Sequence, residues 1–216
     1  MAQQMARKAG ILKTAVVIGA FLAAPAGAQD ACRIAILGDS IASGYGLMLE
    51  DALPAELERR LEAAGYDCEV LDAGVAGDTS AAGLARLDWM LADEPSHVIV
   101  ELGGNDALRA LPPEAMADNL DAILGRLKSE DIPVLLAGMR APPNLGREYG
   151  EAFAAVFPRL AEKHDVALYP FILDGVAADP ELNQEDGIHP TAEGVDEIAR
   201  RMLPAIEAWL EQTGGA

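Results

Sequence analysis

The sequence is poor in basic residues and in aromatic residues. Its 216 residues include 16 Lys and Arg against 35 Asp and Glu, which gives a formal net charge of −19. An acidic protein repels polyanions at long range, so nucleic acids and anionic membrane surfaces are unfavourable partners. Aromatic residues make up only 5% of the chain. This scarcity disfavours a site that binds carbohydrate through a cluster of aromatic rings.

Several sequence signals of other protein classes are also missing. No G-x-G-x-x-G sequence or P-loop follows the first expected strand, which argues against a nucleotide-binding protein. We find no internal repeat, low-complexity tract or linker. The 51% of hydrophobic residues exclude a disordered or collagen-like chain, and the length suits one domain with a full core. We therefore expect a single domain over residues 29–216.

The first 28 residues have the pattern of a secretory signal peptide. Three basic residues come first, Arg7, Lys8 and Lys13. An apolar run from Thr14 to Ala24 follows, and Pro25 to Ala28 ends in an A-x-A pattern, so we predict cleavage after Ala28. The remaining chain then has 35 acidic and 13 basic residues, a formal charge of −22. We expect an exported protein that stays in the periplasm or is secreted.

Two other readings of this N-terminus are weaker. An uncleaved membrane anchor would need a run of roughly 18–20 apolar residues, and Pro25 closes the run early. A lipoprotein anchor on Cys32 would need a lipobox, and Gln29 stands where that motif carries Leu. We therefore expect no stable membrane anchor after cleavage.

The only two cysteines each begin an apolar, strand-like run. Cys32 precedes Arg33–Leu37, and Cys68 precedes Glu69–Asp72. If these runs are neighbouring parallel strands, both thiols lie at the amino-terminal edge of one sheet. A disulfide there is suited to an exported protein, and two buried free thiols are the alternative. Catalytic use is not expected, because open α/β sheets bind ligands at the opposite edge.

Strand-like and helix-like segments alternate along the chain. The expected strands are Arg33–Leu37, Glu69–Asp72, Val98–Val100, Val134–Ala137 and Val166–Tyr169. The expected helices are Leu53–Ala64, Thr79–Leu91, Pro113–Leu127, Tyr149–His164 and Thr191–Leu210. Nearly continuous apolar strands that alternate with amphipathic helices indicate a parallel sheet covered on both faces. The predicted fold is a doubly wound α/β domain.

One of the five serines, Ser40, directly follows a strand. In the sequence Gly38-Asp39-Ser40 a tight turn would expose the hydroxyl at the carboxyl edge of the sheet. Ser43 is a rival one turn later, whereas the other serines fall in helices or a turn. A lone serine in a turn is more often a cap or a turn former, so its partners decide its role.

Among the three histidines, His189 is the candidate for acid–base chemistry. His97 begins a strand at the opposite edge, and His164 ends a helix, so both are expected to be structural. Asp186 precedes His189 by three residues, which lets its carboxylate reach the Nδ1 proton of the ring. Nε2 is then free to take a proton from a serine hydroxyl. Taken alone, the pattern could equally cap the next helix or hold a metal.

Two further loops could stabilise an oxyanion at the same edge. The sequence 74–79 (GVAGDT) follows the second strand, and 103–106 (GGND) follows the third. Backbone N–H groups of Ser40 and Gly77 and the amide of Asn105 would converge there. Either loop alone could be an ordinary strand-to-helix turn. A serine, several N–H donors and a histidine at one edge of the sheet together favour an acyl-transfer enzyme.

These blocks resemble the SGNH, or GDSL, hydrolase superfamily. The matching sequences are GDS at 38–40, Gly77, GGND at 103–106 and D-x-x-H at 186–189. The flanking residues are most similar to the bacterial group of periplasmic arylesterases, lysophospholipases and acyl-CoA thioesterases. The resemblance spans nearly all of the chain after residue 28.

The resemblance implies a flavodoxin-like three-layer α/β/α fold and a serine esterase without metal or cofactor. Ser40 would be the nucleophile, His189 the general base and acid, and Asp186 its orienting partner, with Gly77 and Asn105 in the oxyanion hole. Residues 106–111 match a loop that is mobile in the family, and 141–144 (APPN) match a wall of its acyl site. Ala141 is smaller than the leucine of the thioesterase type, so the acyl-chain preference need not carry over.

The strong negative charge bears on the substrate. Acyl-CoA is polyanionic and cytosolic, so we expect the physiological substrates to be neutral or zwitterionic esters, unless Arg109, Arg140 and Arg147 make the mouth of the site basic. The predicted activity is hydrolysis of aryl and acyl esters, with lysophospholipids and thioesters as further substrates. We expect a monomer that acts on a small ester or lipid. A polysaccharide O-deacetylase is the alternative enzyme, and a non-catalytic α/β binding module is the alternative outside enzymes.

Overall fold

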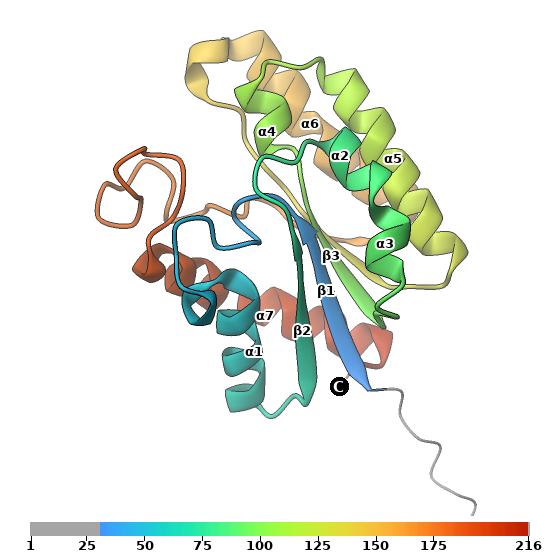
Figure 1. Ribbon diagram of the computed structural model, residues 1–216. Coiled ribbons are helices and arrows are strands. Elements are labelled where there is room, and N and C mark those ends of the chain that lie inside the picture. The colour runs from blue at the N-terminus through green and yellow to red at the C-terminus, as the bar shows by residue number, and fades with distance from the viewer. Residues whose placement is uncertain (1–30, 216) are drawn as a thin grey trace, which may run out of the picture.

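A parallel β-sheet runs through the centre of the computed structural model, which describes residues 31–215 (Figure 1). The signal peptide predicted for residues 1–28 lies outside the described residues. The strands are β1 (Cys32–Gly38), β2 (Cys68–Gly74), β3 (His97–Glu101), β4 (Val134–Ala137) and β5 (Ala167–Tyr169). They are all parallel in the order β2-β1-β3-β4-β5. This confirms the predicted α/β fold with five parallel strands.

Helices cover both faces of the sheet and complete the three layers. One face carries α1 (Leu53–Ala64) and α7 (Ala192–Thr213), which pack against each other (Figure 1). The opposite face is covered by α2 (Ser80–Ala85), α3 (Leu87–Leu91), α4 (Gly104–Leu108), α5 (Pro113–Ser129) and α6 (Arg147–His164). Two short 3-10 helices, η1 (Leu49–Asp51) and η2 (Pro143–Leu145), lie in connections.

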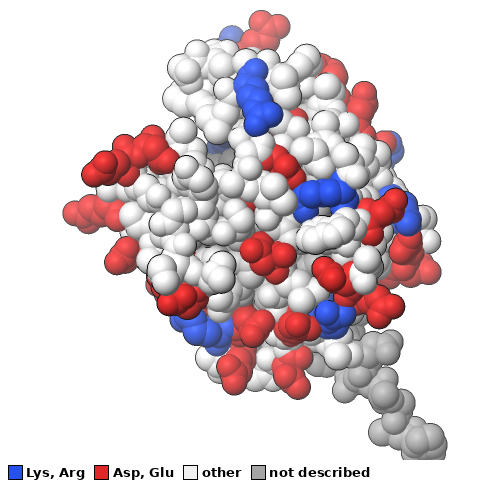
Figure 2. Space-filling view, in the orientation of Figure 1, with Lys and Arg blue, Asp and Glu red and all other residues white. Residues whose placement is uncertain are grey.

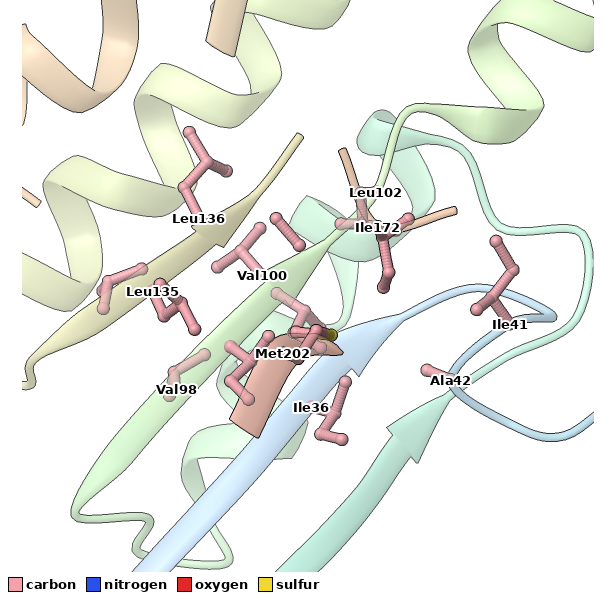
Figure 3. Packing of buried hydrophobic residues seen from close by; sticks show 14 of the residues in the cluster. Ile36, Ile41, Ala42, Val98, Val100, Leu102, Leu135, Leu136, Ile172 and Met202 are labelled. Carbon is pink, nitrogen blue, oxygen red and sulfur yellow. The ribbon is translucent and has the colours of Figure 1, made fainter. Parts of the chain in front are cut away.

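The core lies between these layers and explains why the strands are so apolar. The central strands β1, β3 and β4 contact helices on both faces, so nearly all their residues are buried. Figure 3 shows Ile36, Val100 and Leu135 from three neighbouring strands, together with Met202 from α7. The edge strand β2 instead mixes buried residues with exposed and half-buried ones. Burial on both faces selects a continuous apolar run, which is the pattern that predicted the sheet.

The segment Thr79–Leu91 is two helices rather than the single helix that its sequence predicted. The break falls at Arg86, between α2 and α3. At this break the Arg86 side chain bonds across the fold: its Nε donates to Asp78 Oδ2 (2.6 Å) and its Nη2 donates to the carbonyl of Gly38 (2.9 Å). These contacts across the fold were not visible in the local hydrophobic pattern. The short helix α4 was not predicted either.

The amino-terminal edge of the sheet holds the two cysteines. Cys32 and Cys68 are register partners in β1 and β2, and their sulfur atoms are bonded. Nearby, the buried ring of His97 lies between the hydroxyls of Ser96 (2.9 Å from Nδ1) and Thr213 (3.0 Å from Nε2). The strand start and the end of α7 are thereby tied together. Within residues 31–215, every helix is too short or too polar to cross a bilayer.

Candidate active site

Ser40 lies just after the carboxyl end of β1, an inner strand flanked by β2 and β3. The chain turns sharply here, with the Ser43 N–H donating to the Asp39 carbonyl (3.1 Å). Gly38 lies so close to Glu101 and Ala42 that a Cβ at this position would overlap both side chains. A glycine is therefore required for the close packing that precedes the serine.

His189 connects Ser40 to Asp186 through one continuous set of hydrogen bonds. Its Nε2 lies 2.9 Å from Ser40 Oγ, and its Nδ1 lies 2.6 Å from Asp186 Oδ2. The backbone N–H groups of Ile188 (2.9 Å) and His189 (3.0 Å) donate to the other carboxylate oxygen. The structure thus brings together the three side chains that the sequence singled out. With the proton on Nδ1, Nε2 can accept the serine proton.

The hydrogen bonds to Asp186 also fix its charge. They lower the pKa of this carboxyl to about 2, and the bond from the His189 ring makes the largest contribution. Asp186 is therefore an anion at every pH at which the protein is expected to work. A permanent anion beside Nδ1 favours the imidazolium that forms when His189 takes a proton.

Two contacts hold the loop that carries His189 against the loop that follows β1. Between the loops, the Gln184 side chain donates to the Tyr45 carbonyl (2.8 Å). Within its own loop, Gln184 also donates from its side chain to the Pro190 carbonyl (2.8 Å) and from its N–H to the His189 carbonyl (2.7 Å). The Tyr45 ring also packs against the His189 ring, with 4.5 Å between centroids. These two loops are about 140 residues apart in sequence, and Gln184 was not singled out there.

Three N–H donors are candidates for an oxyanion hole. Asn105 lies in the first turn of α4, two residues after the left-handed Gly103 (φ +119°), and Gly77 also has a positive φ (+88°). One N–H of the Asn105 amide donates to Asp39 Oδ2 (3.0 Å), which leaves its second N–H unused. In the described part of the chain, the backbone N–H groups of Ser40 and Gly77 donate to no protein acceptor. This is the set expected for an oxyanion hole.

Beneath these donors lies a pair of buried carboxyl groups that the sequence did not flag. Asp39 is 1% exposed and Glu101, at the end of β3, is fully buried. The Asp39 N–H donates to Glu101 Oε2 (3.1 Å), while Asp39 Oδ1 accepts from the Ile41 N–H (3.1 Å). The only sequence signal is that Glu101 directly follows an apolar strand and precedes the GGND block.

A second buried network fixes the helix that carries Asn105. Ser80 Oγ donates to Asp106 Oδ1 (2.6 Å), and the Ser80 N–H donates to Oδ2 (2.8 Å). The amide of Asn119 donates to the same serine hydroxyl (3.0 Å). At the other end of residues 106–111, the Tyr149 hydroxyl donates to the Leu111 carbonyl (2.7 Å). Residues 106–111, expected to match a mobile loop, are therefore held at both ends.

An apolar cavity of about 400 Å³ opens beside Ser40 and Asn105. Its walls include Leu108, Met139, Ala141, Pro142, Phe171 and Ile188. Ala141 and Pro142 thus lie in the wall where the sequence resemblance placed an acyl site. No group of three or more His, Cys, Asp or Glu side chains among residues 31–215 is arranged to hold a metal ion.

The other candidate residues take no part in this hydrogen-bonded set. Ser43 makes no hydrogen bond to His189, whose partner is Ser40. His97 lies at the opposite edge of the sheet, and His164 pairs with Asp121 on the surface (2.7 Å). Their positions agree with the structural roles expected for both histidines.

Basic groups at the mouth are few. Arg109 donates to the Gly77 carbonyl (2.7 Å), and Arg140 stacks on Phe171 in the cavity wall with 4.6 Å between guanidinium and ring centre. Arg147 instead pairs with Glu151 on α6. Figure 2 shows acidic side chains spread over much of the visible face, with Lys and Arg in smaller separate groups.

Known proteins share both the sequence and the fold. The chain is 40% identical over 176 residues to the esterase TesA of Pseudomonas aeruginosa, covering 81% of this chain and 88% of that protein. It is 39% identical over 184 residues to thioesterase 1/protease 1/lysophospholipase L1 of Escherichia coli K12, covering 83% and 87%. The solved structure of AlinE4, an SGNH-hydrolase family esterase, is 46% identical with a TM-score of 0.71, covering 84% and 97%.

A family model covers the region that holds nearly all of these features. The model of the GDSL-like lipase/acylhydrolase family matches residues 36–196, from within β1 to the start of α7. This range contains the serine, both donor loops, the cavity and the histidine loop. The chain belongs to the GDSL-like lipase/acylhydrolase family.

Proposed function

We propose that this protein is a serine esterase that hydrolyses carboxylic esters through an acyl-enzyme, with Ser40, His189 and Asp186 as its triad. One observation carries the proposal: the unbroken hydrogen-bonded path from Asp186 to Ser40 ends at the mouth of an apolar cavity. The relatives named esterase and lysophospholipase support the same reaction class.

The geometry accounts for each step of acyl transfer. His189 Nε2 takes the Ser40 proton as Oγ attacks the ester carbonyl carbon. The carbonyl oxygen becomes an oxyanion, stabilised by the N–H groups of Ser40, Gly77 and Asn105. When the tetrahedral intermediate collapses, the carbon–oxygen bond to the leaving group breaks and His189 gives that alkoxide its proton. Water, deprotonated by His189, then attacks the acyl-enzyme. As the second tetrahedral intermediate collapses, the bond from its carbon to Ser40 Oγ breaks, His189 returns the proton to Oγ, and the acid is released.

The cavity favours an acyl chain longer than acetyl. An acetyl group would leave most of the 400 Å³ apolar space unfilled. Each methylene buried there contributes about 0.8 kcal/mol, so kcat/KM should rise roughly fourfold per added CH₂ until the space is full. This argues against the O-deacetylase alternative. The net negative charge disfavours polyanionic thioesters, so neutral esters and zwitterionic lysophospholipids are the proposed substrates.

The disulfide supports the proposed place of action. Disulfides persist in oxidising compartments and are rare in the cytosol. The bond between Cys32 and Cys68 therefore agrees with an exported, periplasmic or secreted enzyme. Because the triad and the donors all come from one chain, we also propose that a monomer is active.

The test is hydrolysis of p-nitrophenyl esters from acetate to palmitate. Wild type, Ser40→Ala and the matched control Ser43→Ala are compared, each without residues 1–28. We expect Ser40→Ala to lose about 10⁴-fold or more in kcat and Ser43→Ala to stay near wild type. Equal rates in Ser40→Ala and wild type would rule out Ser40 as the nucleophile. A maximum at acetate would overturn the acyl-length proposal and favour the deacetylase.

A further inference from the structure

Glu101 is a buried acidic side chain to which the reaction above gives no role. It ends β3, is fully buried, and lies against Asp39, which is itself only 1% exposed. Two carboxylates in contact inside a protein cannot both carry a charge without a large energetic penalty. One of the two groups must therefore hold a proton at neutral pH.

The hydrogen bonds place that proton on Glu101. Asp39 accepts from the Ile41 N–H and from the Asn105 amide, so its carboxylate charge is well solvated by donors. Glu101 Oε2 accepts from the Asp39 N–H, and the Ala42 N–H also lies beside this carboxyl group. Glu101 Oε1 has no partner among the described residues, where the other such buried side-chain atom is Arg86 Nη1. A bare carboxylate oxygen in this position would be costly. A protonated Glu101 would instead donate to the Asp39 carboxylate.

The electrostatic surroundings agree with this assignment. Burial raises the pKa of Glu101 well above its usual value, and the charge of Asp39 raises it further. The other charged groups nearby are Arg86 and His189. Arg86 donates through Nε to Asp78 and through Nη2 to the Gly38 carbonyl, its Nη1 has no partner among residues 31–215, and no ion pair joins it to Glu101. Burial raises the pKa of Asp39 as well, whereas its hydrogen bonds with Ile41 and Asn105 lower it, and protonation of His189 would lower it further.

The neutral acid is connected to the reacting centre by two hydrogen bonds. Glu101 contacts Asp39, and Asp39 Oδ2 accepts from Asn105 Nδ2 at 3.0 Å. Because the amide is planar, fixing one of its N–H groups fixes the direction of the other, which faces the oxyanion in the proposed mechanism. If Asp39 turned, the Asn105 donor would turn with it.

We propose that Glu101 is a positioning residue: as a neutral carboxylic acid it holds the Asp39 carboxylate, which in turn orients the Asn105 amide toward the oxyanion. The proposal rests on the esterase function and on the role of Asn105 in it. It assigns to this acidic side chain a task that requires a hydrogen-bond donor rather than a negative charge.

Glu101→Gln and Glu101→Leu distinguish the need for a hydrogen-bond donor at this position from the need for a side chain of similar size. Glutamine can still donate to Asp39 and accept from its N–H, so kcat should stay within about threefold of wild type. Leucine cannot donate, and kcat should fall about 10-fold to 100-fold with KM nearly unchanged, a part of the 10²–10³ that loss of an oxyanion donor costs. If Gln is as damaging as Leu, or if both match wild type, the proposal is wrong.

A double-mutant cycle with Asn105→Ala distinguishes positioning from a general loss of structure. If Glu101 acts through Asn105, Glu101→Leu should have little further effect on kcat once the amide is gone. Full multiplicative loss in the double variant would overturn the proposal. Loss of activity in Ser40→Ala checks the esterase function separately, so the two claims can fail independently.

Infrared spectroscopy keeps the test valid even if Glu101→Leu does not fold. Wild type at neutral pH should show the C=O stretch of a buried, protonated carboxylic acid, distinct from the carboxylate bands. Glu101→Gln should lack it. If wild type shows no such band that disappears in Glu101→Gln, Glu101 is ionised and the proposal fails.

Discussion

The two edges of the sheet each hold a serine beside a histidine at the same distance. At the carboxyl edge, Ser40 Oγ lies 2.9 Å from His189 Nε2; at the amino edge, Ser96 Oγ lies 2.9 Å from His97 Nδ1. The distance alone therefore does not identify a nucleophile and its base. What differs is the partner of the second ring nitrogen and the surroundings of the hydroxyl.

At the carboxyl edge the second nitrogen faces a carboxylate, and at the amino edge it faces a hydroxyl. Asp186 stabilises a positive His189, whereas Thr213 offers His97 no charge. Burial also lowers the pKa of His97, so its ring resists protonation. Ser96 is occupied by the backbone of Arg33, while Ser40 opens onto the cavity. A charge partner and an open hydroxyl distinguish the candidate active site from the structural pair.

The largest expected effect comes from replacing His189 with glutamine, and the same replacement of His97 is the control. His189→Gln should lower kcat about 10⁴-fold or more, because it removes the base and acid of both half-reactions. His97→Gln should leave kcat within about threefold of wild type and should lower the melting temperature instead. Steady-state kinetics on a p-nitrophenyl ester and thermal unfolding measure both. A large loss of kcat in a folded His97→Gln would erase the distinction between the two edges.

The disulfide should affect stability and leave catalysis alone. It closes a loop with a sequence separation of 36 residues, so its removal should cost about 3–4 kcal/mol of unfolding free energy. In a domain of this size that corresponds to a melting temperature lower by about 10 °C. Cys32→Ala/Cys68→Ala is compared with wild type by thermal unfolding and by kcat well below the transition. A reduced kcat there would show that the two edges are coupled.

The smallest expected effect is a pH dependence of stability at the amino edge. The pKa of folded His97 is lowered, so below its ordinary value of 6.5 the unfolded chain takes up a proton that the folded chain does not. Stability should therefore fall as the pH drops through this range. The melting temperature should decline less between pH 7.5 and pH 5.5 in His97→Gln than in wild type. Equal slopes would show that the ring is not protected from protonation.

Much of this architecture could be predicted from sequence because it follows local rules. Burial of the central strands on both faces demands continuous apolar runs, and these runs located all five strands. Glycine-rich turns after the strands then located the loops that carry Ser40, Gly77 and Asn105. The family resemblance was confirmed by the match over residues 36–196.

The parts that were missed depend on contacts between distant segments. Arg86, where the predicted single helix is broken, bonds to Asp78 and to Gly38, which is 48 residues away. Glu101 reads as an ordinary polar residue at a strand end, and only the packing of β1 beside β3 reveals that it meets Asp39. A single sequence records residue types and spacing, not which side chains share a proton.

The position of the loop that carries His189 has a consequence for the synthesis and folding of the protein. The proposed nucleophile and oxyanion donors all precede residue 106, but the proposed base comes at residue 189 and is held by Gln184 to the loop after β1. If His189 is the base, a chain still being synthesised holds a serine with nothing to activate it. Hydrolytic activity should then appear only when the last segment has docked, so the onset of turnover would report the completion of folding.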